Sequence, residues 1–165
     1  MVVGTWEQDG VVVELTDALD VVASRPTDLS MSELEALIAD VHDALGPAPP
    51  GLVPAHGDLT PWNLRSVPGG RRVLFDWEHR RFAPRDYDLV RFLLATEDGP
   101  ARFARLPVAR RRAARPAVDA LIALSDARCA ARRVDELTDW KWHDIEMERA
   151  ALFELLNLTG AQNEP

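Results

Sequence analysis

The chain has 165 residues, 47% hydrophobic and 28% charged, which is typical of one globular domain with its own hydrophobic core. Its net charge of −8, from 27 acidic residues against 18 arginines and one lysine, argues against nucleic-acid binding, which depends on neutralising phosphates. No apolar run reaches the roughly 18 residues of a membrane span, and the N-terminus does not read as a signal peptide. We therefore expect a cytoplasmic protein that binds neither nucleic acid nor membrane.

The first predicted element is a β-hairpin at the N-terminus. Residues 2–6 and 11–16 are short runs rich in β-branched side chains. The segment between them, residues 8–10, reads Gln-Asp-Gly, which is a turn signal.

A helix is predicted next. Either Ser30 or Ser32 begins it, because each is followed three residues later by a glutamate, the pattern of a capping box. Apolar residues at helical spacing predict one buried face; they are Leu34, Leu37, Ile38, Val41 and Leu45. The proline- and glycine-rich residues 46–51 then end the helix with a stiff loop.

A second hairpin follows an irregular polar segment at residues 55–63. Its strands are predicted at residues 64–67 and 71–75, on either side of Pro68-Gly69-Gly70. From residue 86 onward the pattern is helical. We expect a helix at 86–95, one or two helices over 101–133 interrupted near Pro107 and Pro116, and a last helix from a cap at Thr138 to residue 157. The predicted fold class is α+β, mostly helical.

Polar side chains gather at the open end of the second hairpin. Asn63 precedes its first strand and Asp76 follows its second, so antiparallel pairing about Gly69 brings the two together. Asp58 lies five residues before Asn63 on the same loop. Amide and carboxylate oxygens suit a hard cation such as Mg²⁺, which takes its other ligands from water and phosphates. Asp58 is then free to act as a base or to position a nucleophile.

Two motifs in this region are specific. Residues 56–64 read His-Gly-Asp-Leu-Thr-Pro-Trp-Asn-Leu, and residues 73–78 read Val-Leu-Phe-Asp-Trp-Glu. In this order and spacing they resemble the aminoglycoside phosphotransferase and choline-kinase-like superfamily, and the resemblance is strong over residues 50–95. It implies the C-terminal lobe of a protein-kinase-like fold. That lobe would have a catalytic loop and β-hairpin at residues 55–78 and a helical substrate subdomain at residues 86–158.

The resemblance also implies roles for individual residues. Asp58 would be the catalytic base, while Asn63 and Asp76 would be metal ligands. His56 would brace the loop as a structural residue, and Asp88, at a helix start, would anchor it.

Other residues near these motifs have open interpretations. Glu78 could contact a second metal or a substrate amine, and a plain surface or salt-bridge role is an equal alternative. Asp86 is also explained as a helix cap. The arginines between residues 102 and 115 are expected to form a solvated helix face. Among the histidines, His42, His79 and His143 show no metal-ligand spacing with one another.

In the family that these motifs resemble, a preceding lobe grips ATP through a phosphate-covering loop and a strand lysine. The first hairpin resembles the last two strands of that lobe, so residues 1–22 are expected to be its remnant and residues 23–160 the C-terminal lobe. Glu14 and Thr16 would lie at the hinge that binds adenine. The single lysine, Lys141, is far along the chain. We expect a truncated lobe, with three explanations: a fragment, a second chain that supplies the missing part, or a degenerate member.

The expected function is Mg²⁺- or Mn²⁺-dependent transfer of a phosphoryl group from ATP or another nucleoside triphosphate to a hydroxyl of a small molecule. The acidic composition suits a cationic acceptor. Two other classes stay open: a non-catalytic binding or regulatory module that retains the motif, and a metal-dependent hydrolase that activates water.

Overall fold

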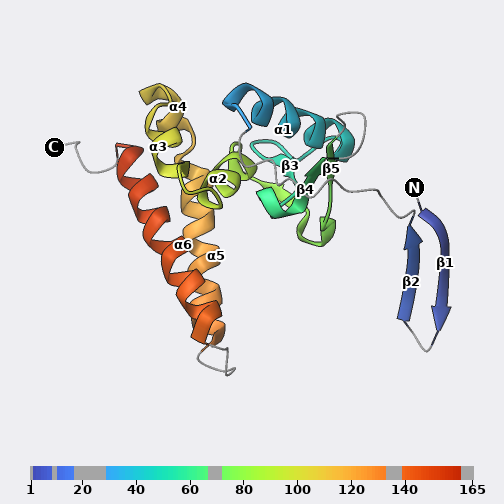
Figure 1. The fold of residues 1–165 in the computed structure, drawn as a ribbon. Helices are drawn as coiled ribbons and strands as arrows, with labels where there is room; N and C mark the ends of the chain where they lie inside the picture. Colours follow the sequence, from blue (N-terminus) through green and yellow to red (C-terminus); the bar gives the residue numbers. More distant parts are fainter. Residues whose placement is uncertain (1, 9–10, 17–28, 67–71, 133–138, 161–165) are drawn as a thin grey trace.

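The computed structural model describes residues 2–8, 11–16, 29–66, 72–132 and 139–160. Within these ranges the chain is mostly helical, with three small antiparallel sheets of two strands each (Figure 1). This agrees with the α+β class that the sequence predicts. No helix in the described ranges has the length and hydrophobicity of a membrane span.

The first sheet is the N-terminal hairpin. Strands β1 (Val2–Gln8) and β2 (Val11–Thr16) pair antiparallel, with Trp6 opposite Val13, so the predicted hairpin is confirmed. The proposed hinge residues Glu14 and Thr16 belong to β2, but their side chains lie outside the described part of the chain. Their contact with adenine therefore stays a prediction.

Helix α1 (Met31–Leu45) begins at a capping box, as predicted. Ser30 is its N-cap: the hydroxyl accepts the N–H of Glu33 at 3.3 Å, and the Glu33 carboxylate accepts the N–H of Ser30 at 2.9 Å. Ser30 rather than Ser32 is thus the cap. The predicted apolar face of the helix packs on the core, where Leu34 is fully buried.

Two further sheets support the polar segments. Strand β4 (Leu64–Ser66) pairs with β5 (Arg72–Leu74), which confirms the second predicted hairpin. Strand β3 (Val53–Ala55) pairs with β6 (Arg81–Ala83), a sheet that the sequence interpretation missed. Three-residue strands are too short to show a recognisable alternation, and these two partners are far apart in the chain. As a result, the end of the loop that follows β3 and the end of the turn that precedes β6 lie next to each other.

Helix α2 (Tyr87–Leu94) lies at the centre of the core. Four of its side chains, Leu89, Val90, Phe92 and Leu93, are at most 1% exposed. The remaining helices are α3 (Gly99–Ala104), α4 (Val108–Ala113), α5 (Arg115–Arg132) and α6 (Asp139–Leu158). Helices α1, α3, α5 and α6 all pack against α2, and α5 and α6 run side by side (Figure 1).

The segment from residue 99 to residue 132 holds three helices, whereas the sequence predicts one or two. Pro107 is the N-cap of α4, so one expected interruption falls where predicted. Pro116 does not interrupt a helix but lies in the first turn of α5, where its missing N–H costs little. The predicted cap Thr138 lies outside the described residues.

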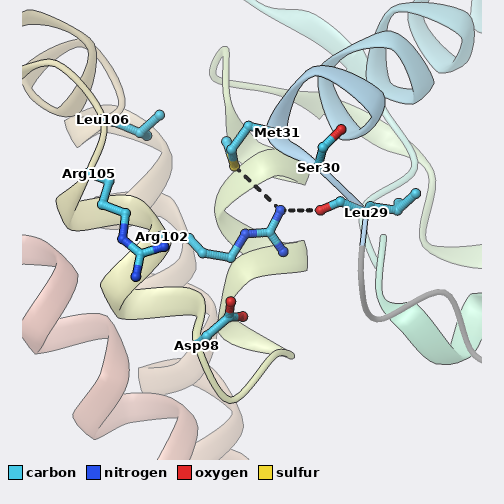
Figure 2. A pocket seen from close by; sticks show the side chains of 7 residues that line it. All are labelled: Leu29, Ser30, Met31, Asp98, Arg102, Arg105 and Leu106. Carbon is cyan, nitrogen blue, oxygen red and sulfur yellow. Dashed lines mark hydrogen bonds between the residues drawn. The ribbon is translucent and has the colours of Figure 1, made fainter.

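The arginines of this segment form the predicted solvated face only in part: Arg105 and Arg112 are exposed, whereas Arg102 is buried. Arg102 is only 9% exposed and donates to the carbonyl oxygen of Leu29 and to Sδ of Met31, beside a cavity of about 340 Å³ (Figure 2). Arg111 donates to the carbonyl oxygen of Ala104, at the end of α3. Carbonyls at a helix end lack intrahelical partners, and arginine is well suited to satisfy them.

Candidate active site

The loop that follows β3 is held by one buried carboxylate. Asp88, which is 2% exposed, accepts the N–H of His56 at 2.7 Å and the N–H of Gly57 at 3.0 Å. Burial raises the pKa of the Asp88 carboxyl, and the two N–H donors, which lower it, offset this only in part. Asp88 lies in the first turn of α2, where the helix dipole favours a negative charge. The family resemblance implies an anchoring role for Asp88, and the structure places its carboxylate in hydrogen-bond contact with the loop backbone.

Asp86 does not cap α2 with its side chain, contrary to the sequence interpretation. It is the N-cap residue by position, with φ of 69°, but it makes no side-chain capping bond. Its carboxylate instead pairs with Arg110 at 2.8 Å, and Arg110 also lies 3.6 Å from Glu35. Burial raises the pKa of Asp86. The backbone at Asp86 does not have capping geometry. Its side chain instead connects the start of α2 to Arg110 of α4, and Arg110 in turn approaches Glu35 of α1.

His56 is fully buried beneath the same loop. Its Nδ1 accepts the N–H of Asp58 at 3.3 Å, and its Nε2 lies 2.8 Å from the carbonyl oxygen of Phe75. With Nδ1 as the acceptor, the proton is on Nε2, which donates to that carbonyl. The ring packs against Trp77, with 4.7 Å between ring centroids. His56 therefore joins the loop to the residue just before Asp76, as a bracing residue would.

Asn63 and Asp58 meet directly. The amide nitrogen of Asn63 donates to the backbone carbonyl of Asp58 at 2.9 Å and to Oδ2 of Asp58 at 3.0 Å. The backbone carbonyl of Asn63 accepts the N–H of Phe75 at 2.8 Å, so residue 63 lies opposite residue 75, as the hairpin predicts. The amide oxygen of Asn63 is the atom that a metal would use.

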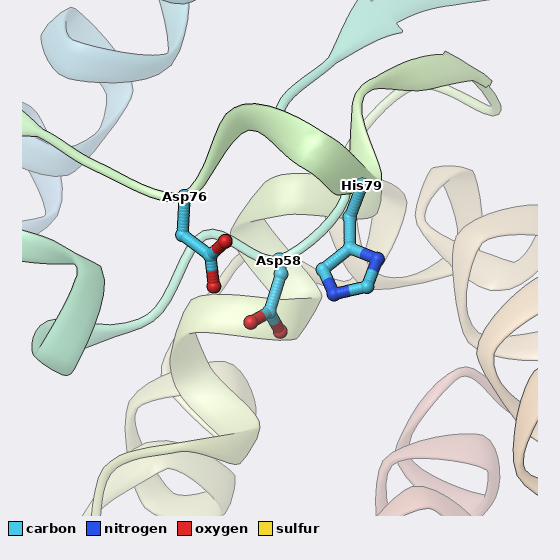
Figure 3. A group of neighbouring side chains, drawn as sticks. All are labelled: Asp58, Asp76 and His79. Carbon is cyan, nitrogen blue, oxygen red and sulfur yellow. The ribbon is translucent and has the colours of Figure 1, made fainter. Parts of the chain in front are cut away.

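Asp76 and His79 converge on Asp58 (Figure 3). One potential ligand atom from each of the three side chains lies within 4.8 Å of the other two. Asp76 adopts φ of 65°, in the left-handed region that aspartate tolerates better than most residues, and begins the short turn Trp77–His79. The spacing among the histidines predicts no metal role for His79, because carboxylates are not part of that comparison. The structure instead groups His79 with two carboxylates, three residues beyond Asp76.

These donors fit a divalent cation. Two carboxylates, from Asp58 and Asp76, lie close enough to repel each other, and a cation between them would relieve that repulsion. The amide of Asn63 is bonded to one of these two carboxylates. Oxygen donors of this kind are those that Mg²⁺ and Mn²⁺ take in proteins.

Glu78 is not a member of this group. Its carboxylate is 72% exposed and lies 3.4 Å from Nε2 of its neighbour His79. This placement matches the surface or salt-bridge alternative, and no described contact connects Glu78 with Asp58 or Asp76.

Arg91 places a cation beside Asp58 and was not singled out in the sequence. Its Nε and Nη2 lie 2.9 and 2.8 Å from Oδ1 of Asp58, and its Nη1 lies 3.2 Å from Oε2 of Glu148. Burial lowers the pKa of Arg91, but the carboxylates of Glu148 and Asp58 outweigh this and raise it. Arg91 follows Asp88 by three residues on α2, so the two share a helix face. That spacing is the signal that could have identified it.

Replacing Arg91 with methionine is expected to destabilise the protein by about 2 kcal/mol, below the 3–5 kcal/mol typical of a fully buried pair. The loss is smaller here because the carboxylates of Asp58 and Glu148 keep 19% and 20% exposure. Urea unfolding measures it. Adding Glu148→Gln should restore part of the stability, because one uncompensated charge is removed; a double variant with no recovery would contradict the charge explanation.

A cleft of about 960 Å³ opens next to Arg91. Residues from the short turn Pro61–Asn63 and from α2, α3 and α6 line it, among them Trp62 and Met147. Its described charged residues are three glutamates, Glu97, Glu148 and Glu154, against the single cation Arg91. The charges that line the cleft are thus mostly negative, which favours cationic small molecules, although Glu148 is also paired with Arg91 at 3.2 Å and with Arg128 at 3.8 Å.

Comparison with known proteins gives one match. The model of the phosphotransferase enzyme family matches residues 12–121. This range runs from β2 into α5 and includes the loop after β3, strands β4 and β5 and all of helix α2. No curated protein and no solved structure matches the chain significantly.

Proposed function

Because the chain belongs to the phosphotransferase enzyme family, as its motifs indicate, we propose that it transfers a phosphoryl group from ATP or another nucleoside triphosphate to a hydroxyl of a small molecule. One observation carries the proposal: Asn63 and Asp76 both reach Asp58 at the open end of the β4–β5 hairpin. An amide, a carboxylate and a loop aspartate in this arrangement are the parts that kinase-type phosphoryl transfer requires of this lobe.

In this proposal Asp58 receives and orients the acceptor hydroxyl and accepts its proton. Its carboxylate is fixed from both sides, because Arg91 binds Oδ1 and Asn63 binds Oδ2. Asp76 and the amide oxygen of Asn63 would hold Mg²⁺ or Mn²⁺, which when bound neutralises charge on the nucleotide phosphates.

The supporting residues keep this geometry rigid. His56 and Asp88 bond the loop to β5 and to the buried helix α2. Since both are buried, the catalytic loop has little freedom to move away from Asp76.

The negative cleft beside Arg91 supports a cationic acceptor, such as a hydroxyl compound that carries an amine. Glu148 contributes to the cleft and is also bonded to Arg91, which binds Asp58. An amine at this glutamate would bring the rest of the molecule toward the catalytic loop.

We also propose a division of the chain. Residues 1–22, with β1 and β2, would belong to the nucleotide lobe, with Glu14 and Thr16 at the hinge. Residues 23–160 would form the catalytic lobe, and a second chain could contribute to the nucleotide grip. The competing proposal is a non-catalytic binding or regulatory module that keeps the same motif.

Magnesium-dependent nucleotide binding separates these two proposals. Calorimetry with a non-hydrolysable ATP analogue should show binding that Mg²⁺ strengthens. Asp76→Ala should weaken that Mg²⁺-dependent part by about tenfold or more, the scale expected when a metal site is damaged. Glu78→Ala, an exposed neighbour outside the cluster, is the matched control and should bind normally. Affinity that is the same with and without Mg²⁺ would favour the non-catalytic module.

The isolated chain is expected to turn over slowly. Its single lysine is Lys141, in α6, so the strand lysine that pairs ATP phosphates in this class of enzyme has no counterpart in β1 or β2. Loss of one such charge contact costs about 3–4 kcal/mol in the transition state, or a factor of about 10²–10³ in rate. Mass spectrometry of hydroxyl amines incubated with ATP measures the rate. Turnover at about 1–100 s⁻¹, typical of kinases, would contradict this expectation, and phosphate release without an acceptor would indicate a hydrolase.

A further inference from the structure

We propose that His79 is a protein ligand in the metal site and that, with Asp58 and Asp76, it binds a divalent transition-metal ion without nucleotide. The three side chains already place one ligand atom each within 4.8 Å of the others (Figure 3). They come from two segments, the loop after β3 and the turn before β6, which the β3–β6 pairing joins at their base.

The backbone of His79 is fixed in this position. Its carbonyl oxygen accepts a hydrogen bond from Nε of Arg81 at 3.1 Å. The same carbonyl is pressed against the catalytic loop, since a Cβ added to Gly57 would lie 2.0 Å from it. The backbone of His79 thus contacts the loop on one side and is bonded to Arg81 of β6 on the other. These contacts fix the position of its Cα, and therefore the point from which the ring extends toward Asp58.

The ring of His79 is also accessible to a ligand. Its side chain is 41% exposed, and its described polar contact is a 3.4 Å approach of Nε2 to the exposed carboxylate of Glu78. That distance is longer than a good hydrogen bond and costs little to replace.

A nitrogen donor changes which ions the site prefers. Mg²⁺ takes oxygen ligands and keeps several waters, whereas imidazole suits Fe²⁺, Ni²⁺, Cu²⁺ and Zn²⁺, and the two carboxylates also suit Mn²⁺. Two carboxylates and one imidazole supply three protein donors, enough for binding before a nucleotide adds its phosphates. The inference rests on the proposed function in that both use Asp58 and Asp76, but the binding it describes requires neither nucleotide nor phosphoryl transfer.

The test is a titration of the full chain with Mn²⁺, without nucleotide, followed by electron paramagnetic resonance. Pulsed measurements detect ¹⁴N coupling when an imidazole is bound to Mn²⁺. The wild type should bind Mn²⁺ and show that coupling. His79→Gln should lose the coupling and bind Mn²⁺ at least about tenfold more weakly, as even the loss of a supporting residue weakens metal sites by that much. His42→Gln, on α1, is the matched control and should behave as the wild type.

The other outcomes are equally decisive. Retained ¹⁴N coupling in His79→Gln, absent coupling in the wild type, or no Mn²⁺ binding would each overturn the inference. Asp76→Ala should lose the bound Mn²⁺, and retention would place the ion elsewhere and overturn the inference as well. Nitrogen-coupled Mn²⁺ in a chain that binds no Mg²⁺–nucleotide would leave this inference standing while the proposed function fails. Mg²⁺-dependent nucleotide binding without nitrogen coupling to Mn²⁺ would overturn this inference and leave the proposed function standing.

Discussion

Replacing Asp88 with alanine is expected to lower the free energy of unfolding by about 3–5 kcal/mol. The substitution leaves the N–H groups of His56 and Gly57 without their acceptor, and both residues are buried. An unsatisfied buried donor costs about 1–3 kcal/mol, more when its lost partner was charged. Two such donors in adjacent residues, together with a small cavity at the start of α2, account for the expected total.

Urea unfolding followed by tryptophan fluorescence measures this loss. The matched control is Asp119→Ala on α5, where an exposed aspartate pairs with Arg115 one helical turn away; its removal should cost about 0.5 kcal/mol or less. Asp88→Asn should fall between wild type and Asp88→Ala, because one acceptor oxygen remains. If Asp88→Ala were no worse than the control, the anchoring role of Asp88 would be wrong.

The loss should also depend on pH in a defined direction. The pKa of Asp88 is raised by burial in the folded state, so the folded protein holds this proton more tightly than the unfolded chain. Its contribution to stability is then fully present below the unfolded value, about 3.9, and declines as pH rises through the folded value. The difference between wild type and Asp88→Ala should therefore be larger at acidic pH than at pH 7. A difference that grows with rising pH would contradict the direction of the shift.

Local signals in the sequence were sufficient for the parts of the fold that depend on neighbouring residues. Ser30 and Glu33 cap α1 through a contact three residues apart, and the antiparallel pairing of β4 with β5 brings Asn63 to Phe75. The meeting of Asn63, Asp58 and Asp76 follows from that register. These predictions needed only chain geometry over about twenty residues.

The remaining features depend on tertiary contacts that no local pattern encodes. Arg91 reaches Asp58 because α2 is buried beneath the loop, and Glu148 reaches Arg91 because α6 packs on α2. The arginines from residue 102 to residue 115 have the pattern of a surface charge run, yet Arg102 bonds to Leu29, far away in sequence. His79 was missed because one of its two neighbouring carboxylates, Asp58, is on another loop, although its place three residues after Asp76 in a turn is a usable signal.

The same contact between the loop and the turn makes Gly57 a second position of large expected effect. Gly57→Ala should destabilise the protein by about 3 kcal/mol or more. Gly57 has φ of +86°, which costs a residue with a Cβ about 1–2 kcal/mol. The added Cβ would also lie 2.0 Å from the carbonyl oxygen of His79 and 2.8 Å from its carbonyl carbon, and forced overpacking costs a further 1–3 kcal/mol, roughly.

Gly51→Ala separates these two causes. Gly51 has a similar φ of +82°, but nothing lies within 4 Å of its added Cβ. Its substitution should therefore show only the backbone cost of about 1–2 kcal/mol. The excess loss in Gly57→Ala measures the clash with His79, and equal losses in the two variants would show that the loop and the turn are not in tight contact. Because the clash pushes the backbone of His79 and the loop that carries Asp58 apart, Gly57→Ala should also weaken divalent-metal binding, whereas Gly51→Ala should leave it intact.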